Sequence, residues 1–158
     1  MDKLYINTNK AIYKLENGIL ICELKSDLII DLKTAVHLVN ERIKITENHS
    51  MPFLLVVKNY LLLDKDAFEY LGSKEGIQNL QASAVVIDSP LQKLITNFNL
   101  LFYKNVIPFR VFNKKSEAKL WLFEFVKENE KEMFNSLNVI FVLLLNRLRI
   151  AGDLIKNI

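Results

Sequence analysis

Alternating apolar and polar positions near the start of the chain predict a β-hairpin over residues 10–24. The dipeptide Asn17-Gly18 divides this segment, and it suits the two positive-φ positions of a type I′ turn. We therefore expect two antiparallel strands joined by this turn, and we place them at the edge of a sheet.

A helical period follows over residues 31–46. One apolar stripe repeats at spacings of four and three residues and consists of Leu32, Val36, Val39 and Ile43. The opposite face is polar and consists of Lys33, His37, Asn40, Glu41 and Lys44. Asp31 precedes the first helical residue, and aspartate is a favoured N-cap.

Three apolar runs, residues 53–57, 82–87 and 109–112, are typical of strands buried on both faces. Helices are predicted between and after them: residues 64–71, a segment from Ser89-Pro90 to Phe102, and a helix capped by Asn113. The inner face of the last helix holds Ala118, Trp121, Leu122 and Phe125. The resulting order, β-β-α-β-α-β-α-β-α, predicts an α/β fold with a four- or five-stranded mixed sheet. Residues 53–57 and 82–87 should be adjacent central strands.

The end of the chain carries a separate apolar pattern. Its seam alternates spacings of four and three residues, as in a coiled coil, and consists of Leu137, Phe141, Leu144, Leu148, Ala151 and Ile155. We expect residues 1–128 to form the α/β domain and residues 129–158 to form an added C-terminal helix. An apolar face this wide must be covered, either by its own domain or by another subunit. We favour a two-fold homodimer, the commonest closed oligomer, with a dimer face made of Leu137, Phe141, Leu144, Leu148 and Ile155.

The amino-acid composition and net charge indicate which classes of protein are expected for this chain. The 158 residues are 51% hydrophobic and 25% charged, which is typical of one globular domain. Lys and Arg number 21 against 18 Asp and Glu, without a basic block, so we expect no nucleic-acid partner. No leader-like start is visible, and the longest apolar run, residues 139–145, is too short for a transmembrane segment. With a single cysteine, the chain is predicted to be cytoplasmic.

The residues that could carry chemistry are few. His37 is a candidate base or metal ligand, but it lies on a polar helix face without positioned partners, and His49 lies in a polar loop. Cys22 is expected to be a packed strand residue rather than a nucleophile. Asp64 and Asp66 are interpreted as helix-capping residues rather than a cation site. We therefore predict no enzyme activity, no metal site and no cofactor.

Three stretches carry a resemblance to a known family: residues 52–57, residues 82–90, and residues 108–112 followed by Glu117-Ala118-Lys119-Leu120-Trp121-Leu122. Together with the order of elements over residues 11–126, they resemble the STAS fold of anti-sigma-factor antagonists. The closest resemblance is to the SpoIIAA-like (STAS/SEC14-like) group of small bacterial proteins.

The STAS resemblance implies a non-catalytic regulatory or protein-interaction module. STAS antagonists carry a regulatory serine after the third strand, whereas the matching turn here is Leu63-Asp64-Lys65-Asp66-Ala67, which has no hydroxyl group. Switching by phosphorylation at that turn is therefore not expected. The SEC14-like resemblance implies an alternative, a small apolar-ligand (lipid-like) binding protein with a pocket at Phe98, Leu101 and Phe102. A cavity of roughly 300 Å³ or more beneath these residues would favour that alternative.

Overall fold

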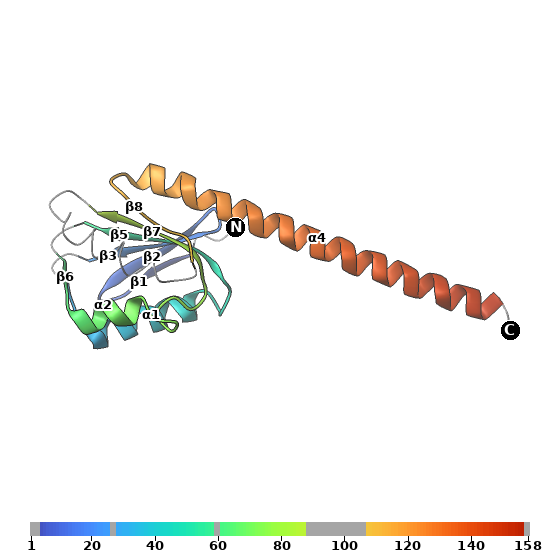
Figure 1. Cartoon of the computed structure of the whole chain (residues 1–158), viewed down its shortest axis with the longest axis horizontal. Helices are drawn as coiled ribbons and strands as arrows, with labels where there is room; N and C mark the ends of the chain where they lie inside the picture. Colours follow the sequence, from blue (N-terminus) through green and yellow to red (C-terminus); the bar gives the residue numbers. More distant parts are fainter. Residues whose placement is uncertain (1–3, 26–27, 59–60, 88–106, 157–158) are drawn as a thin grey trace. The chain divides into compact units, whose positions relative to one another are not determined.

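The computed structural model of the chain, which describes residues 4–25, 28–58, 61–87 and 107–156, contains a six-stranded mixed sheet (Figure 1). In spatial order the strands are β1 (Tyr5–Asn7), β2 (Ala11–Glu16), β3 (Ile19–Leu24), β5 (Met51–Val57), β7 (Leu80–Ile87) and β8 (Phe109–Phe112). The first three are antiparallel, and β3, β5, β7 and β8 are parallel. The chain divides into two compact units, Met1–Val126 and Lys127–Ile158, and the sheet belongs to the first.

The predicted mixed sheet is confirmed, but its predicted size is wrong, because six strands are present rather than four or five. The hairpin does not form the edge, since β1 pairs with the outer side of β2. A three-residue strand carries too short a pattern to be recognised by alternation. The predicted central pair is confirmed: β5 and β7 are parallel neighbours, flanked by β3 and β8.

The hairpin turn has the predicted geometry. Asn17 and Gly18 have φ values of 51° and 78°, and Glu16 pairs with Ile19. A Cβ atom on Gly18 would lie 2.8 Å from the Val126 Cγ1 atom. Glycine is therefore required here both by the positive φ and by the close approach of Val126.

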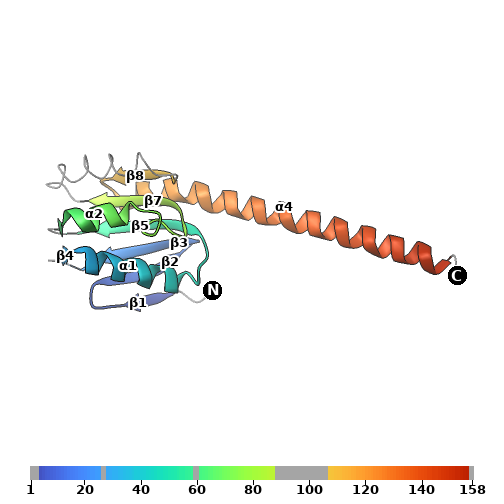
Figure 2. The same cartoon turned by 60° about the horizontal axis from the view of Figure 1, so that its bottom comes forward.

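A second sheet, which the sequence pattern does not predict, has two short parallel strands, β4 (Leu28–Ile30) and β6 (Leu61–Leu63). Each strand leads into a helix, α1 (Leu32–Ile45) after β4 and α2 (Lys65–Leu71) after β6. The predicted caps are confirmed: Asp31 accepts a hydrogen bond from the Thr34 amide and Asp64 from the Ala67 amide, each at 2.7 Å. Both helices pack on the same face of the main sheet (Figure 2).

The buried face of α1 differs from the predicted stripe. The buried residues are Thr34, Ala35, Val39 and Arg42, whereas Leu32 is exposed. The inward face is thus rotated by about one residue from the apolar stripe. The face is rotated because Arg42, although charged, points inward. Its guanidinium donates hydrogen bonds to the buried carbonyl oxygens of Gly76 and Gln78.

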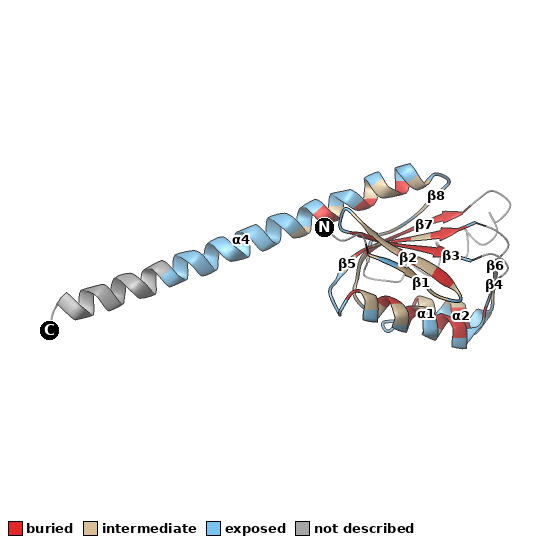
Figure 3. Cartoon of the chain, turned by 180° about the vertical axis from the view of Figure 1, so that it is seen from behind, coloured by how far each residue is buried: buried red, intermediate tan, exposed pale blue. Residues whose placement is uncertain are grey.

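The start of α4 (Lys115–Lys156) covers the opposite face of the sheet. Ala118, Leu122 and Val126 are buried there, and Trp121 and Phe125 pack beside them, so most of the predicted inner face is confirmed. Figure 3 shows buried residues along the central strands and on the inner sides of the helices. The predicted N-cap Asn113 is wrong, because α4 begins at Lys115 and the residue before it is Lys114. The Lys114 carbonyl oxygen accepts a hydrogen bond from the Ala118 amide at the start of the helix.

The predicted order needs a further correction at the C-terminal end. The helix expected after Asn113 and the added C-terminal helix are one continuous helix, α4. Residues 127–131, Lys-Glu-Asn-Glu-Lys, contain no glycine or proline that would end it. The predicted helix from Ser89-Pro90 to Phe102 lies outside the described residues. In the part of the chain that the structure describes, no helix has both the length and the apolar character needed to cross a membrane.

Candidate functional site

The predicted C-terminal face is an exposed apolar surface in the described part of α4. Nine side chains are between 53 and 65% exposed: Met133, Phe134, Leu137, Val139, Ile140, Phe141, Val142, Leu143 and Leu144. This set includes the predicted Leu137, Phe141 and Leu144. The backbone of α4 continues past Leu148 and Ile155, but their side chains lie outside the described residues.

The predicted pocket residues Phe98, Leu101 and Phe102 also lie outside the described residues. The structure shows an apolar cavity at another place, between α1 and the sheet. It has a volume of about 80 Å³, and its apolar walls include Leu38, Val39, Phe53, Leu55 and Val85. This volume is well below the roughly 300 Å³ at which drug-sized pockets begin.

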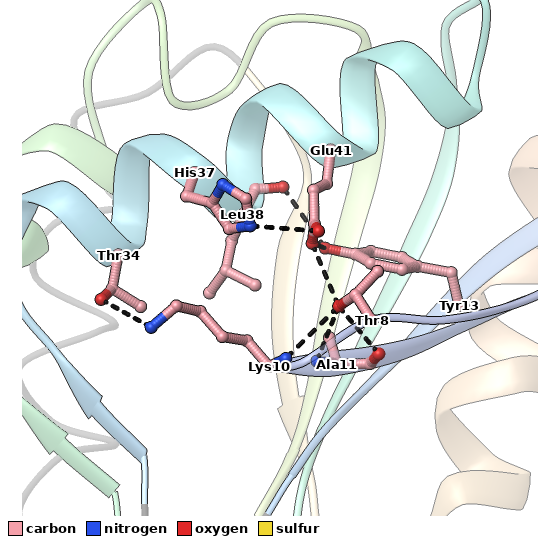
Figure 4. Close-up of polar contacts among 8 residues, drawn as sticks. All are labelled: Thr8, Lys10, Ala11, Tyr13, Thr34, His37, Leu38 and Glu41. Carbon is pink, nitrogen blue, oxygen red and sulfur yellow. Dashed lines mark hydrogen bonds and ion pairs between the residues drawn. The ribbon is translucent and has the colours of Figure 1, made fainter.

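A carboxylate joins α1 to β2 and its preceding loop (Figure 4). The hydroxyl of buried Tyr13 donates a hydrogen bond to Glu41 Oε2 at 3.1 Å, and the Thr8 hydroxyl lies 3.4 Å from the same oxygen. The other oxygen, Oε1, lies 3.1 Å from His37 Nε2. His37 therefore has a positioned partner, which the sequence analysis missed although its spacing of four residues from Glu41 is a signal for such a pair.

This cluster is suited to holding α1 on the sheet. Burial raises the pKa of the Tyr13 phenol, and the nearby Cys22 and Glu41 raise it further, so the hydroxyl remains a donor. Glu41 uses both oxygens for its partners in the cluster. The carboxylate of Glu41 thus ties α1 to Tyr13 of β2 and to Thr8 of the loop before that strand.

Cys22 is buried beneath the same helix, as predicted. Desolvation raises the pKa of its thiol to about 12, so the thiol stays protonated at neutral pH. His49 caps its own loop, with Nδ1 3.1 Å from the Thr46 carbonyl oxygen. Among the described residues, no three His, Cys, Asp or Glu side chains gather in a way that could hold a metal ion.

Arg42 lies on the wall of the cavity and is only 5% exposed. Its Nη2 donates hydrogen bonds to the carbonyl oxygens of Gly76 at 3.0 Å and Gln78 at 2.8 Å. The guanidinium also lies 5.5 Å from the centre of the Phe53 ring. Burial lowers the pKa of Arg42 to about 10, so the residue remains charged at neutral pH.

A second charged group lies on the α4 side of the sheet. Glu23 is buried in β3, with Oε1 2.6 Å from Lys115 Nζ and 3.5 Å from Lys14 Nζ, and Oε2 3.0 Å from Lys58 Nζ. Burial alone would raise the pKa of this carboxyl, but hydrogen bonds from Lys115 and Lys58 outweigh it and hold the pKa at about 2. The signal in the sequence was one acidic residue within a strand that is otherwise apolar, Ile-Leu-Ile-Cys-Glu-Leu.

Residues 13–126 match a family model described as Domain of unknown function (DUF7793). The chain belongs to this family. No curated protein and no solved structure matches the chain. The DUF7793 match extends from Tyr13 in β2 to Val126, the last residue of the N-terminal unit. It therefore contains Tyr13, His37, Glu41, Arg42 and Glu23, but neither Thr8 nor the exposed face of α4.

Proposed function

We propose that this DUF7793 chain is a non-catalytic protein-interaction module of STAS-like type, and that it binds a second copy of itself through the helix after Val126. The observation that supports this proposal is the exposed apolar surface between Met133 and Leu144. Burying one such side chain stabilises by about 1.5–3 kcal/mol, so a partner that covers the surface gains a large driving force. A contiguous exposed apolar surface of this kind marks an interaction site.

The spacing of the apolar residues indicates that the partner is a helix with the same apolar pattern, as in a second copy of α4. Phe134, Leu137, Phe141 and Leu144 alternate spacings of three and four residues, the pattern by which two helices pack along a shared seam. Val142 and Leu143 lie outside this seam. A pair of helices leaves them exposed, and association of two pairs would cover them.

The distribution of charge favours an antiparallel pair. No charged residue occurs from Met133 to Asn146. The six residues 127–132 before this stretch contain three glutamates and two lysines, a net charge of −1, and Arg147 and Arg149 follow the stretch with a net charge of +2. In an antiparallel pair centred on the apolar stretch, the acidic flank of each copy faces the basic flank of the other. A parallel pair would bring like charges together, which is unfavourable.

The first experiment tests self-association. We expect the natural chain to sediment as a dimer, or as a pair of dimers, at micromolar concentration. The double variant Leu144→Glu with Leu148→Glu should be a folded monomer. The control variant, Asn135→Glu with Ser136→Glu, adds the same charge at exposed polar positions off the seam and should still associate. A natural chain that is monomeric at this concentration would refute the proposal.

The second experiment tests orientation by disulfide formation. In an antiparallel pair centred near residue 139, position 134 of one copy lies beside position 144 of the other. Phe134→Cys mixed with Leu144→Cys should therefore give a mixed disulfide dimer, whereas Phe134→Cys alone should not. Native Cys22 is buried and should not interfere. Rapid cross-linking of Phe134→Cys to itself would indicate a parallel pair.

A further inference from the structure

Arg42 is a buried cation that has no anionic partner among the residues that the structure describes. The ion pairs among the described residues involve other side chains, and none includes Arg42. The groups that act on its charge most strongly are Tyr13, Cys22 and Tyr70, none of which is a carboxylate. Buried charges in proteins are normally paired, because carbonyl dipoles compensate a full charge only in part.

A buried donor of the guanidinium also has no partner among the described residues. Nη2 is occupied by the carbonyl oxygens of Gly76 and Gln78, but buried Nε has no hydrogen-bond partner among the described residues. The carbonyl of Gly76 is fixed by a close approach of the backbone, because a Cβ atom there would lie 2.1 Å from the Tyr70 carbonyl oxygen. The two bonds of Nη2 thus hold Arg42 in place, while its Nε–H donor has no acceptor among the described residues.

The cavity beside Arg42 has the size and lining for a small amphiphile. The cavity has a volume of about 80 Å³, whereas one water molecule occupies roughly 30 Å³ in the liquid. An engineered protein cavity of about 150 Å³, roughly twice as large, binds benzene. Besides Arg42, its polar lining comes from Ser83, Cys22 and Tyr13, and the remaining walls are apolar except at Gly76. A cluster of waters would find few of the two to four polar partners that each buried water needs.

We propose that this cavity binds a small carboxylate of about four non-hydrogen atoms, the size of acetate, because its volume is about half that of the cavity that holds the six carbons of benzene. The carboxylate accepts hydrogen bonds from the Arg42 guanidinium, including Nε. Its short hydrocarbon tail packs against Val39, Phe53 and Val85. Such a ligand supplies both the missing negative charge and the missing acceptor, and charge-assisted hydrogen bonds of this kind are the strong ones. This site is independent of the self-association proposed for α4.

The test is a titration of the full chain with acetate, followed by the Arg42 Nε–H resonance in ¹H–¹⁵N spectra. We expect a saturable downfield shift of this resonance. Ethanol, which has the methyl tail without the charge, should bind at least about tenfold more weakly, because it cannot pair with the guanidinium. Sodium chloride at the same concentration supplies an anion without a tail and should leave the resonance unchanged.

Two variants separate the cavity from the charge. Ser83→Leu places three carbons where the hydroxyl oxygen stood, fills the cavity, and should abolish the acetate shift while Arg42 keeps its bonds to Gly76 and Gln78. In Arg42→Met, where binding is followed by the backbone amide resonances of Val39 and Val85 in the cavity wall, the preference for acetate over ethanol should be lost. No saturable shift in the natural chain would overturn the proposal, as would an equal response to chloride. Binding that persists in Ser83→Leu would also overturn it, because the ligand would then lie outside the cavity. If Arg42→Met fails to fold, the natural chain and Ser83→Leu still decide the question.

Discussion

Replacing Glu23 by glutamine should destabilise the fold strongly at neutral pH and weakly in acid. The carboxyl titrates near its ordinary pKa of 4.5 in the unfolded chain but at about 2 in the folded chain. Each pH unit between these values is worth about 1.36 kcal/mol, so the ionised carboxylate contributes about 3 kcal/mol. Because the folded pKa is lowered, this contribution is fully present above pH 4.5 and is lost as the pH falls toward 2. The side chain of Glu23 is 9% exposed, but its lysine partners are 30–60% exposed, so water screens part of the interaction and about 3 kcal/mol is its upper limit.

Urea denaturation of the natural chain and of Glu23→Gln, at pH 7 and near pH 2, measures this effect. The two proteins should differ by up to about 3 kcal/mol at pH 7 and converge near pH 2. Glu69→Gln is the matched control, because Glu69 pairs with Lys65 at 3.7 Å on the surface, where such pairs contribute only about 0–1 kcal/mol. A loss in Glu23→Gln that is equally large at both pH values would refute the reasoning, since it would then arise from packing rather than charge.

Three further predictions concern the N-terminal unit. Gly18→Ala should cost at least about 1–2 kcal/mol in chemical denaturation, because φ is 78° and the new Cβ approaches Val126; an unchanged midpoint would contradict this. Cys22 should not react with a thiol reagent in the native protein but should react fully in urea, and prompt labelling of the native chain would contradict its burial. Incubation with cell extract and ATP should add no phosphate between Leu61 and Leu71, and stoichiometric modification found there by peptide mapping would overturn that expectation.

The elements that could be predicted from the sequence are those with local causes. The Asn17-Gly18 turn depends on two adjacent residues, and the caps Asp31 and Asp64 each bond an amide three residues ahead. The central strands of the sheet are recognisable because both of their faces are buried and apolar. By contrast, β1, β4 and β6 are each three residues long, and they are strands only because a partner lies beside them.

The polar groups of the interior could not be predicted because their partners are distant in sequence. Buried Arg42 donates hydrogen bonds to the carbonyl oxygens of Gly76 and Gln78, which are 34 and 36 residues away in the sequence. Buried Glu23 accepts a hydrogen bond from Lys115, which is 92 residues away. A hydropathy pattern counts both residues as solvent-facing. The hydropathy pattern therefore places the inward face of α1 about one residue from its position in the structure. The pattern also gives no indication of the cavity beside Arg42.

The small sheet of β4 and β6 has a consequence for the electrostatics of the two helices that follow it. The Asp64 amide bonds the Ile30 carbonyl oxygen at 3.1 Å, so α1 and α2 begin beside each other after parallel strands. Each helix start carries the positive end of a macrodipole, equivalent to about half an elementary charge, and two such ends side by side repel. Asp31 and Asp64 place one negative charge at each end. Each aspartate lies nearest to its own helix end and stabilises the positive charge there, and a neutral cap such as serine would satisfy the amides without supplying that charge.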